Sequence, residues 1–311
     1  MKLSGSRWKA RGRHLSWRAA AGSAVVLAVA VAAAPSAVAS GAHAGTVRVA
    51  IPTPPKDPAV AALVPASVRA KGYVTVAMDA TYAPDEFVAP NGHTIIGMDA
   101  DFNAALGAVM GIKWKAVNAT FDTIIPGLES GKFDVGNSSF TVTAAREKVV
   151  TFVTYFKAGE AFYVKSSSTL KLGGLSSLCG LTVAVESGTT EQSDAQSTIA
   201  TCKKAGKKPD EVQSYPNQNE ANLAVASGRA DLGFADSQVA GYIVQQSHGQ
   251  FKLDGRAIEV APYGIAFPKS SKLPRATQAA FEVLMKDGVY AKILAKWGVQ
   301  AGAVGRSTIA G

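Results

Sequence analysis

Short β-rich runs alternate with segments of helical spacing along most of this chain, and this alternation restricts its fold more than any other feature. Strands are predicted at 73–79 (YVTVAMD) and 114–119 (WKAVNA), and helices at 97–111 and 121–131. A third strand with its loop follows at 133–140 (FDVGNSSF). Such alternation predicts an α/β fold with parallel sheets flanked by helices, in which ligands bind at the carboxyl ends of the strands.

A second series of the same kind begins after residue 180. The segment 181–200 reads as a strand, a glycine turn and a helix, and 221–246 reads as a helix, a turn, a strand and a helix. ESGKFDVGNSSF at 129–140 is similar in outline to ASGRADLGFADS at 226–237, since each joins a helix end to a short strand and a polar loop. Because the likeness occurs only twice, we predict two similar domains and not a solenoid.

The first 44 residues are patterned differently from the rest. A basic segment through Arg18 precedes an apolar, alanine-rich run that ends at Pro35, and small residues follow at 37–39 and 42–44. The run is shorter than the roughly 20 apolar residues of a transmembrane helix, so this layout predicts a signal peptide over 1–44. No cysteine follows the run, so a lipid-anchored N-terminus is not expected. Residues 45–66 are proline-rich and predict an exposed lead-in linker with one short helix.

Charge and cysteine content agree with an exported protein that binds no nucleic acid. The formal net charge is +9, but six basic residues lie within the first 18 positions, so the remainder carries +3. That small excess does not predict a polyanionic partner. The only two cysteines, Cys179 and Cys202, lie in one region, and in an exported chain an even count predicts a disulfide.

The segment 138–146 (SSFTVTAAR) gathers hydroxyl groups next to a guanidinium. Arg146 offers fixed parallel donors for a carboxylate, and Ser139 and Thr141 point to one side of an extended loop. The alternative is structural, with Thr143 capping the helix that begins at AARE. Residues Gly188, Thr189 and Thr190 likewise open a predicted helix, where free N–H groups suit an anion or an ordinary cap.

In order along the chain, YAPDEF, GMDADFNAALG, FDTIIPGLESGKFDVG, SSFTVTAAREKVVTFVTYF, VAVESGTTEQ, SGRADLGFADSQVA and PYGIAF occur between residue 67 and the end. Together these motifs resemble the type 3 family of bacterial extracellular solute-binding proteins, the amino-acid receptors of ABC importers. The resemblance implies a two-lobed periplasmic-binding-protein fold, with lobe 1 at 67–159 plus 262–311 and lobe 2 at 160–261. Two hinge crossings would join the lobes, and one L-amino acid would bind in the cleft between them.

The resemblance also implies roles for individual residues. Ser139, Thr141 and Arg146 would hold the α-carboxylate and amino group, and Asp236 would pair with the α-ammonium. Aromatic faces of Tyr82 and Phe121 would enclose the side chain, although core packing is the alternative for both. The full expected set of ligand-binding residues is Asp79, Tyr82, Phe121, Ser138, Ser139, Phe140, Thr141, Arg146, Thr189, Thr190 and Asp236.

The side-chain end of the expected site favours a cationic ligand. Asp79 occupies a family position that accepts hydrogen bonds from a polar or cationic ligand tip, while Glu86 and Glu160 lie in neighbouring loops and either add negative field or are solvated. We therefore expect arginine, lysine or ornithine, with glutamine or histidine next. The expected partners are this ligand and a membrane ABC permease, and the protein is expected to be a monomer.

Catalytic, metal and cofactor sites are not expected. GNSSF at 136–140 lacks the closing glycine of a nucleophile elbow, and the calcium-like start at Asp99 lacks its glycine and its final carboxylate. No His/Cys spacing suits zinc, and no glycine loop suits a phosphate. Two rival functions stay open at this point. One is an exported prephenate or arogenate dehydratase using Glu86, Glu160 or Glu191 as an acid, and the other is a sensory ligand-binding domain.

Overall fold

The computed structural model describes residues 51–311, so the predicted signal peptide lies outside the described residues. The helices, in chain order, are α1 (Pro58–Leu63), α2 (Ala66–Lys71), α3 (Met98–Met110), α4 (Phe121–Glu129), α5 (Ala144–Glu147), α6 (Thr190–Lys204), α7 (Gln218–Ser227), α8 (Ser237–Gln246), α9 (Pro274–Lys286) and α10 (Val289–Trp297), with 3-10 turns η1 (Leu175–Leu178) and η2 (Gln300–Gly302). The strands are β1 (Tyr73–Met78), β2 (Thr81–Tyr82), β3 (Glu86–Val88), β4 (Ile95–Ile96), β5 (Lys113–Asn118), β6 (Val135–Gly136), β7 (Val150–Lys165), β8 (Thr182–Glu186), β9 (Glu211–Tyr215), β10 (Leu232–Asp236), β11 (Phe251–Pro268) and β12 (Ile309–Ala310).

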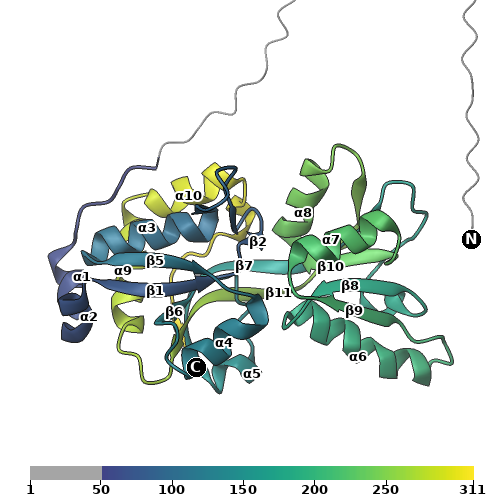
Figure 1. The fold of residues 1–311 in the computed structure, drawn as a ribbon, viewed down its shortest axis with the longest axis horizontal. Helices are drawn as coiled ribbons and strands as arrows, with labels where there is room; N and C mark the ends of the chain where they lie inside the picture. The colour runs from purple at the N-terminus through teal and green to yellow at the C-terminus, as the bar shows by residue number, and fades with distance from the viewer. Residues whose placement is uncertain (1–50) are drawn as a thin grey trace, which may run out of the picture. The chain divides into compact units, whose positions relative to one another are not determined.

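One mixed sheet organises the described chain, in the order β5-β1-β6-β11-β7-β10-β8-β9, with β12 paired to β7. Strands β5, β1 and β6 are parallel to one another, and so are β10, β8 and β9. The long antiparallel strands β7 and β11 lie between these two groups and extend from one to the other (Figure 1). We call the part around β1, β5 and β6 the first lobe and the part around β8, β9 and β10 the second lobe.

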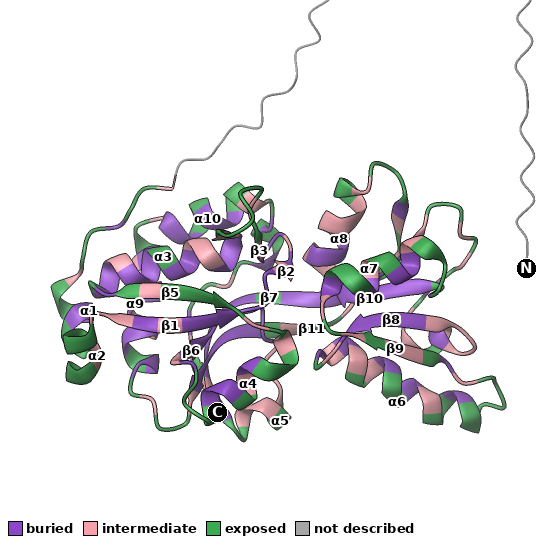
Figure 2. Cartoon of the chain, viewed as in Figure 1, coloured by how far each residue is buried: buried purple, intermediate pink, exposed green. Residues whose placement is uncertain are grey.

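Each lobe has helices packed on its strands and a core of its own. In the first lobe, α3, α9 and α10 pack together over a core that includes Phe102, Tyr155 and Phe281. In the second lobe, α6, α7 and α8 contact β8 and β10. Strands β1 and β7 are mostly buried, whereas the outward faces of α2 and α6 are exposed (Figure 2). None of the helices in residues 51–311 has the length and apolar character that a bilayer-spanning segment needs.

The predicted lobe boundaries fall inside the two long strands. The pairing of β7 with β11 shifts register between Asp254 and Ile258 and again between Ile258 and Ala261, near the predicted crossing points at 160 and 261. Such irregularities bend strands locally, which suits a hinge. The boundaries themselves stay a prediction.

The packed part of the chain begins before the expected start at Ser67. Asp57 Oδ1 accepts hydrogen bonds from the N–H groups of Ala59 (2.8 Å) and Val60 (3.0 Å), and Pro58 stands in the first turn of α1. Proline favours this position because its nitrogen has no proton to leave unsatisfied. Val60 and Val64 are buried in the first-lobe core. The expected exposed linker is therefore a packed helix from Asp57 onward.

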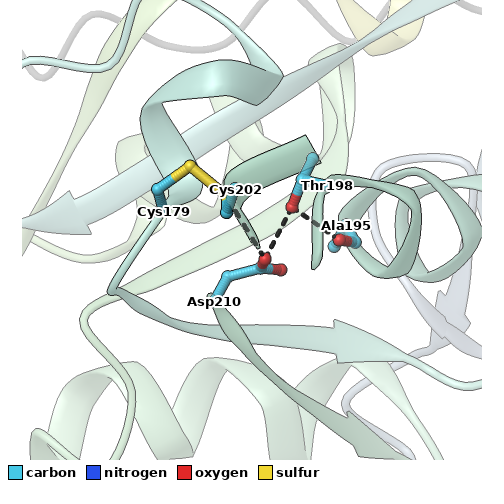
Figure 3. Close-up of a disulfide and its surroundings, with 5 residues drawn as sticks. All are labelled: Cys179, Ala195, Thr198, Cys202 and Asp210. Carbon is cyan, nitrogen blue, oxygen red and sulfur yellow. Dashed lines mark hydrogen bonds between the residues drawn. A yellow bond between two sulfur atoms is a disulfide. The ribbon is translucent and has the colours of Figure 1, made fainter. Parts of the chain in front are cut away.

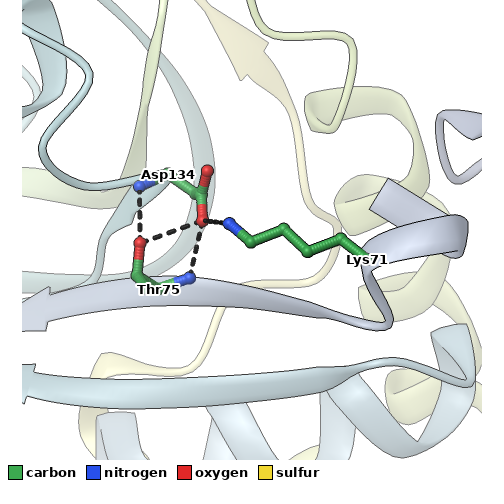
Figure 4. A network of polar contacts seen from close by, with 3 residues as sticks. All are labelled: Lys71, Thr75 and Asp134. Carbon is green, nitrogen blue, oxygen red and sulfur yellow. Dashed lines mark hydrogen bonds and ion pairs between the residues drawn. The ribbon is translucent and has the colours of Figure 1, made fainter. Parts of the chain in front are cut away.

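A three-residue polar network anchors the approach to β6 (Figure 4). The carboxylate of Asp134 accepts hydrogen bonds from the Thr75 N–H (2.8 Å), the Thr75 hydroxyl (2.9 Å) and Lys71 Nζ (2.9 Å). Burial alone would raise the pKa of Asp134, but the hydrogen bonds from Lys71 and Thr75 lower it. The network ties β6 to β1, and so fixes the start of the loop that carries Ser138 and Ser139.

The predicted disulfide is confirmed. Cys179 follows η1 and Cys202 lies on α6, with Cα atoms 5.5 Å apart and 23 positions between them in sequence (Figure 3). Beside the bridge, the Thr198 hydroxyl donates to Asp210 Oδ1 at 2.7 Å. The bond fastens α6, whose first turn faces the candidate site, to the segment before β8.

We expect the double variant Cys179→Ser/Cys202→Ser to fold with a lower free energy of unfolding, by about 3 kcal/mol, because the closed loop restricts the unfolded chain. Urea denaturation of the variant and of the oxidised protein measures the difference. Reduced wild-type protein is the control and should match the variant. Equal midpoints for oxidised and reduced protein would contradict the prediction.

Candidate functional site

A small cavity lies between the two lobes. Its lining residues are Asp79, Tyr82, Phe121, Ser138, Ser139, Thr141, Arg146, Glu186, Thr189, Thr190, Glu191 and Asp236. Ten of the eleven residues expected from the sequence are in this set. Phe140 is missing from it, and Glu186 and Glu191 are additions.

The cavity is built at the carboxyl ends of parallel strands from both lobes. Asp79 directly follows β1, and Ser138 and Ser139 follow β6. Glu186 and Asp236 are the last residues of β8 and β10. Ligands of α/β sheets bind at this edge because loops and helix N-termini converge there.

Arg146 links the two lobes across the cavity. Its Nη1 donates to the Thr141 carbonyl at 2.8 Å, and its Nη2 donates to the Gly188 carbonyl of the second lobe at 2.9 Å. Among the described residues, no carboxylate lies within ion-pair distance of this guanidinium. The guanidinium has five N–H donors, so others are left to bind an anion. Thr143 also caps α5, accepting from the Arg146 N–H at 3.2 Å, so the structural and functional interpretations of 138–146 coexist.

Phe140 lies beneath the cavity wall. Its ring is 1% exposed and stacks on Phe121 with centroids 4.7 Å apart. The guanidinium carbon of Arg146 lies 5.3 Å from the Phe121 ring and 5.5 Å from the Phe140 ring, within the range of cation–π attraction. Phe140 therefore supports Phe121 and Arg146 from behind, and direct ligand contact was the wrong expectation for it.

Tyr82 and Asp236 form a second link between the lobes. The Tyr82 hydroxyl donates to Asp236 Oδ2 at 2.9 Å and accepts from the Asp236 N–H at 3.1 Å. Asp236 stands at the N-cap position of α8, but its side chain makes no capping hydrogen bond. Burial raises the pKa of Asp236 to about 6, against hydrogen bonds from Tyr263 and Tyr82 that lower it. The carboxylate is thus directed at the cavity and not at the helix.

Asp79 is held rigidly in the first lobe. Its Oδ1 accepts from the Thr81 N–H (3.1 Å) and hydroxyl (2.7 Å), and its Oδ2 accepts from the Phe121 N–H at 3.0 Å. Burial raises the pKa of Asp79 although these bonds lower it. The bond to Phe121 places the start of α4, and the aromatic ring with it, beside the carboxylate.

The two threonines at the N-terminus of α6 make different contacts. Thr189 Oγ1 accepts from the Gln192 N–H at 3.1 Å and donates to the Glu186 carbonyl at 2.8 Å, so it is an ordinary helix cap. Thr190 Oγ1 lies 3.5 Å from Thr141 Oγ1 of the first lobe. Both expected roles are therefore present at this N-terminus, where N–H groups and the helix dipole favour an anion.

Two buried acids in the lining were not expected as ligand residues. Glu186 is 2% exposed and Glu191 is 1% exposed, and in each the Oε1 atom has no hydrogen-bond partner. Burial raises the pKa of both carboxyls, and nearby Asp79 adds to the effect for Glu186. The signal available in the sequence was position, because Glu186 ends a predicted strand two residues before the Gly188 turn. The cavity therefore holds four acids and one arginine.

A second acidic group lies behind the loop of Ser138 and Ser139. The Ser138 hydroxyl donates to Glu86 Oε1 at 2.6 Å and accepts from the Asp79 N–H at 2.9 Å. Glu86 is fully buried there, as the first residue of β3, so the alternative that it is solvated in a loop is wrong. Glu160 is also buried and lies outside the lining, and burial raises its pKa to about 9.

Ser139 is held in an unusual backbone conformation by two other acids, Asp85 and Asp99. Its φ is 50°, in the left-handed region, while its N–H donates to Asp99 Oδ2 and its hydroxyl to Asp85 Oδ2, both at 3.0 Å. These two bonds offset the cost of the conformation. Within residues 51–311, no group of three or more His, Cys, Asp or Glu side chains has the arrangement of a metal site.

The model of the bacterial extracellular solute-binding proteins, family 3, matches residues 74–300. The chain belongs to this family. The arginine-binding protein ArgT of Corynebacterium glutamicum is 32% identical over 257 residues, which are 82% of this chain and 84% of that protein. The lysine/arginine/ornithine-binding periplasmic protein of Escherichia coli is 27% identical over 253 residues, covering 77% and 95%.

A solved structure of an ancestral arginine-binding protein bound to arginine shares the fold of this family 3 chain with a TM-score of 0.67. It is 35% identical and covers 73% of this chain and 98% of its own. The ancestral amino acid-binding protein AncCDT-1, a precursor of cyclohexadienyl dehydratase, has the same TM-score at 31% identity, covering 75% and 97%. The resemblance, the two-lobed α/β fold and the solute-binding function expected from the sequence are confirmed.

The raised pKa values predict how the stability of the ligand-free family 3 protein depends on pH. Asp99 and Asp236 have pKa values of about 6, above the unfolded value of about 3.9. As pH rises, the unfolded chain releases these protons first, so the folded state holds more protons and becomes less stable. Between pH 4 and pH 8 we expect a loss on the order of 3 kcal/mol per group.

Thermal melting of ligand-free protein over this pH range measures the effect. The variant Asp236→Asn lacks one of the two titrating groups, so its melting temperature should depend less steeply on pH. Stability that rises steadily from pH 4 to pH 8 in the wild type would contradict the prediction.

Proposed function

We propose that this chain binds a cationic L-amino acid, with L-arginine as the first candidate, and delivers it to an ABC permease. One observation carries the proposal. Four buried acids, Asp79, Glu186, Glu191 and Asp236, line a cavity that contains one guanidinium, and two of those acids have an oxygen without a partner. Buried carboxylates need a cation or a proton, and a dibasic amino acid supplies two cations with one anion.

The cavity offers a complementary group for each part of such a ligand. The α-carboxylate fits between the remaining donors of Arg146 and the N-terminus of α6. The α-ammonium fits Asp236, whose carboxylate is directed at the cavity by Tyr82. The side chain would extend along Phe121 toward Asp79, which the same backbone bond holds beside the ring.

The relatives of this chain support a basic ligand. The similar proteins include binders of arginine and of lysine, arginine and ornithine. An ancestral arginine-binding protein of 34% identity is described as bound to glutamine, so glutamine stays the nearest neutral alternative. We propose that the receptor works as a monomer with its permease.

A receptor is proposed here and not an enzyme. The candidate acids of a dehydratase were Glu86, Glu160 and Glu191. Glu86 and Glu160 are outside the cavity lining, and the carboxylate of Glu86 accepts a hydrogen bond from the Ser138 hydroxyl. Glu191 lines the cavity among other acids, and its placement serves cation binding equally well. The neighbour of the dehydratase lineage, AncCDT-1, is itself described as amino acid-binding.

We expect Arg146→Ala and Asp236→Ala each to weaken arginine binding by about 3 to 5 kcal/mol, several hundredfold or more, because each leaves a buried ligand charge unpaired. Titration calorimetry with L-arginine measures the loss. Melting curves show whether each variant folds, since Arg146 also bridges Thr141 and Gly188. Affinity close to wild type in a folded Arg146→Ala protein would refute the carboxylate clamp.

Export is proposed from the leader pattern together with the extracellular character of the family. The leader lies outside the described residues. We expect secreted protein to begin near Ser40 or Gly45, after the small residues at 37–39 or 42–44. Intact-mass measurement of the secreted protein tests this, and retention of Met1 would contradict it.

A further inference from the structure

We infer that Glu186 determines the specificity of this receptor. Its carboxylate, from the second lobe, and that of Asp79, from the first, form a two-carboxylate receptor for the cationic end of the ligand's side chain. The same pair resists closure of the lobes around an uncharged amino acid. This inference rests on the proposed function, capture of a cationic amino acid.

The position of Glu186 is the first support. Its side chain lines the cavity and is 2% exposed, with Oε1 unpartnered. Its backbone carbonyl accepts a hydrogen bond from the Thr189 hydroxyl, which holds the backbone of Glu186 beside the cap of α6. A buried carboxylate directed into a ligand cavity without a partner is unsatisfied until something in the cavity binds it.

The pairing with Asp79 is the second support. The carboxyl groups of Asp79 and Glu186 line the same cavity although they belong to different lobes, and burial together with the nearby charge of Asp79 raises the pKa of Glu186. Two neighbouring carboxyl groups that are both removed from water are stabilised by a proton or a bridging cation. Because Asp79 is immobilised by Thr81 and Phe121, Glu186 is the member that arrives with the second lobe.

Among residues 51–311, neither member of this pair forms an ion pair. The charged groups with the largest effect on the pKa of Glu186 are Asp79, Asp122 and Asp236, all acidic. Arg146, the one basic residue of the lining, is held by the carbonyls of Thr141 and Gly188. A guanidinium placed between the two carboxylates can donate to both with its planar donors. A neutral ligand side chain of the same shape leaves the repulsion between the two carboxylates in place. Specificity arises from this penalty as much as from attraction between the carboxylates and a cation.

L-Arginine and L-citrulline isolate this effect because they have nearly the same shape and differ in the charge of the side-chain end. Calorimetry on wild type, Glu186→Gln and the control Glu129→Gln gives the ratio of their affinities. Glu129 is exposed at the end of α4 and outside the lining, and its substitution changes the net charge equally. We expect Glu186→Gln to lower the arginine-to-citrulline ratio by about 10-fold to 100-fold, the loss of one charge-assisted hydrogen bond, with the control unchanged.

A second variant keeps the inference testable if Glu186→Gln does not fold. Asp79→Asn removes the other member of the pair and should lower the same ratio, and melting curves identify any variant that does not fold. A folded Glu186→Gln protein that keeps the wild-type ratio would overturn the inference and leave the proposed function standing. Wild-type protein that binds neither arginine nor lysine nor ornithine would overturn both.

The pH dependence of the arginine-to-citrulline affinity ratio distinguishes an effect of charge from an effect of ligand shape. In wild type, citrulline binding should strengthen from pH 8 to pH 5, because the acidified pair holds the proton that replaces the missing cation. The other acids that act on Glu186, Asp122 and Asp236, are present with both ligands, so the affinity ratio reports the pair. In Glu186→Gln the ratio should be nearly independent of pH, and a ratio that keeps the wild-type pH dependence would contradict the inference.

Discussion

Acidic side chains are buried between the two lobes without basic partners, and the arrangement of the lobes depends on how the charge of these side chains is neutralised. The two ion pairs among the described residues, Lys71–Asp134 and Lys296–Asp101, involve none of the acids that line the cavity. Removing a carboxylate from water without a counter-charge is costly, so these groups bind protons or a ligand cation. The closed arrangement therefore costs least free energy when a cation is inside, and ligand binding and lobe closure become one coupled equilibrium.

The mixed sheet makes that coupling possible. Strands β7 and β11 pair with each other and continue into both lobes, so the two parallel groups are joined by two connected strands only. Each group directs its carboxyl ends at the same space, and several of the contacts across it are polar. Tyr82 reaches Asp236, Arg146 reaches Gly188, and Gln238 donates to Asp85 at 2.6 Å. Polar links of this kind stabilise closure without the large apolar interface that would make it permanent.

Local signals in the sequence accounted for the α/β alternation, the disulfide and ten of the lining residues, since strand ends, helix caps and the order of motifs are features of short segments. Other features depend on packing between distant segments. Glu186 has a partnerless oxygen in a cavity that Asp79 of the other lobe also lines, and nothing near Glu186 in the sequence shows this. Phe140 stands among binding residues in sequence but below them in space. A short helix was expected where α1 lies, but its prolines suggested that the segment is exposed, whereas Val60 and Val64 are buried in the first-lobe core.

The cavity combines acids that lack ion-pair partners with an arginine whose guanidinium donates only to carbonyls. The position of Arg146 explains this combination. A carboxylate bound to this guanidinium would compete with the ligand's own α-carboxylate, whereas carbonyls orient the planar group and leave its charge unneutralised. One of those carbonyls, that of Gly188, precedes the N-terminus of α6, so the guanidinium reaches its full set of bonds only when the second lobe is in place. In the proposed function this guanidinium holds the α-carboxylate that every amino acid has, so it would also sense closure. Discrimination among side chains would then be left to the part of the cavity that Asp79 and Glu186 line.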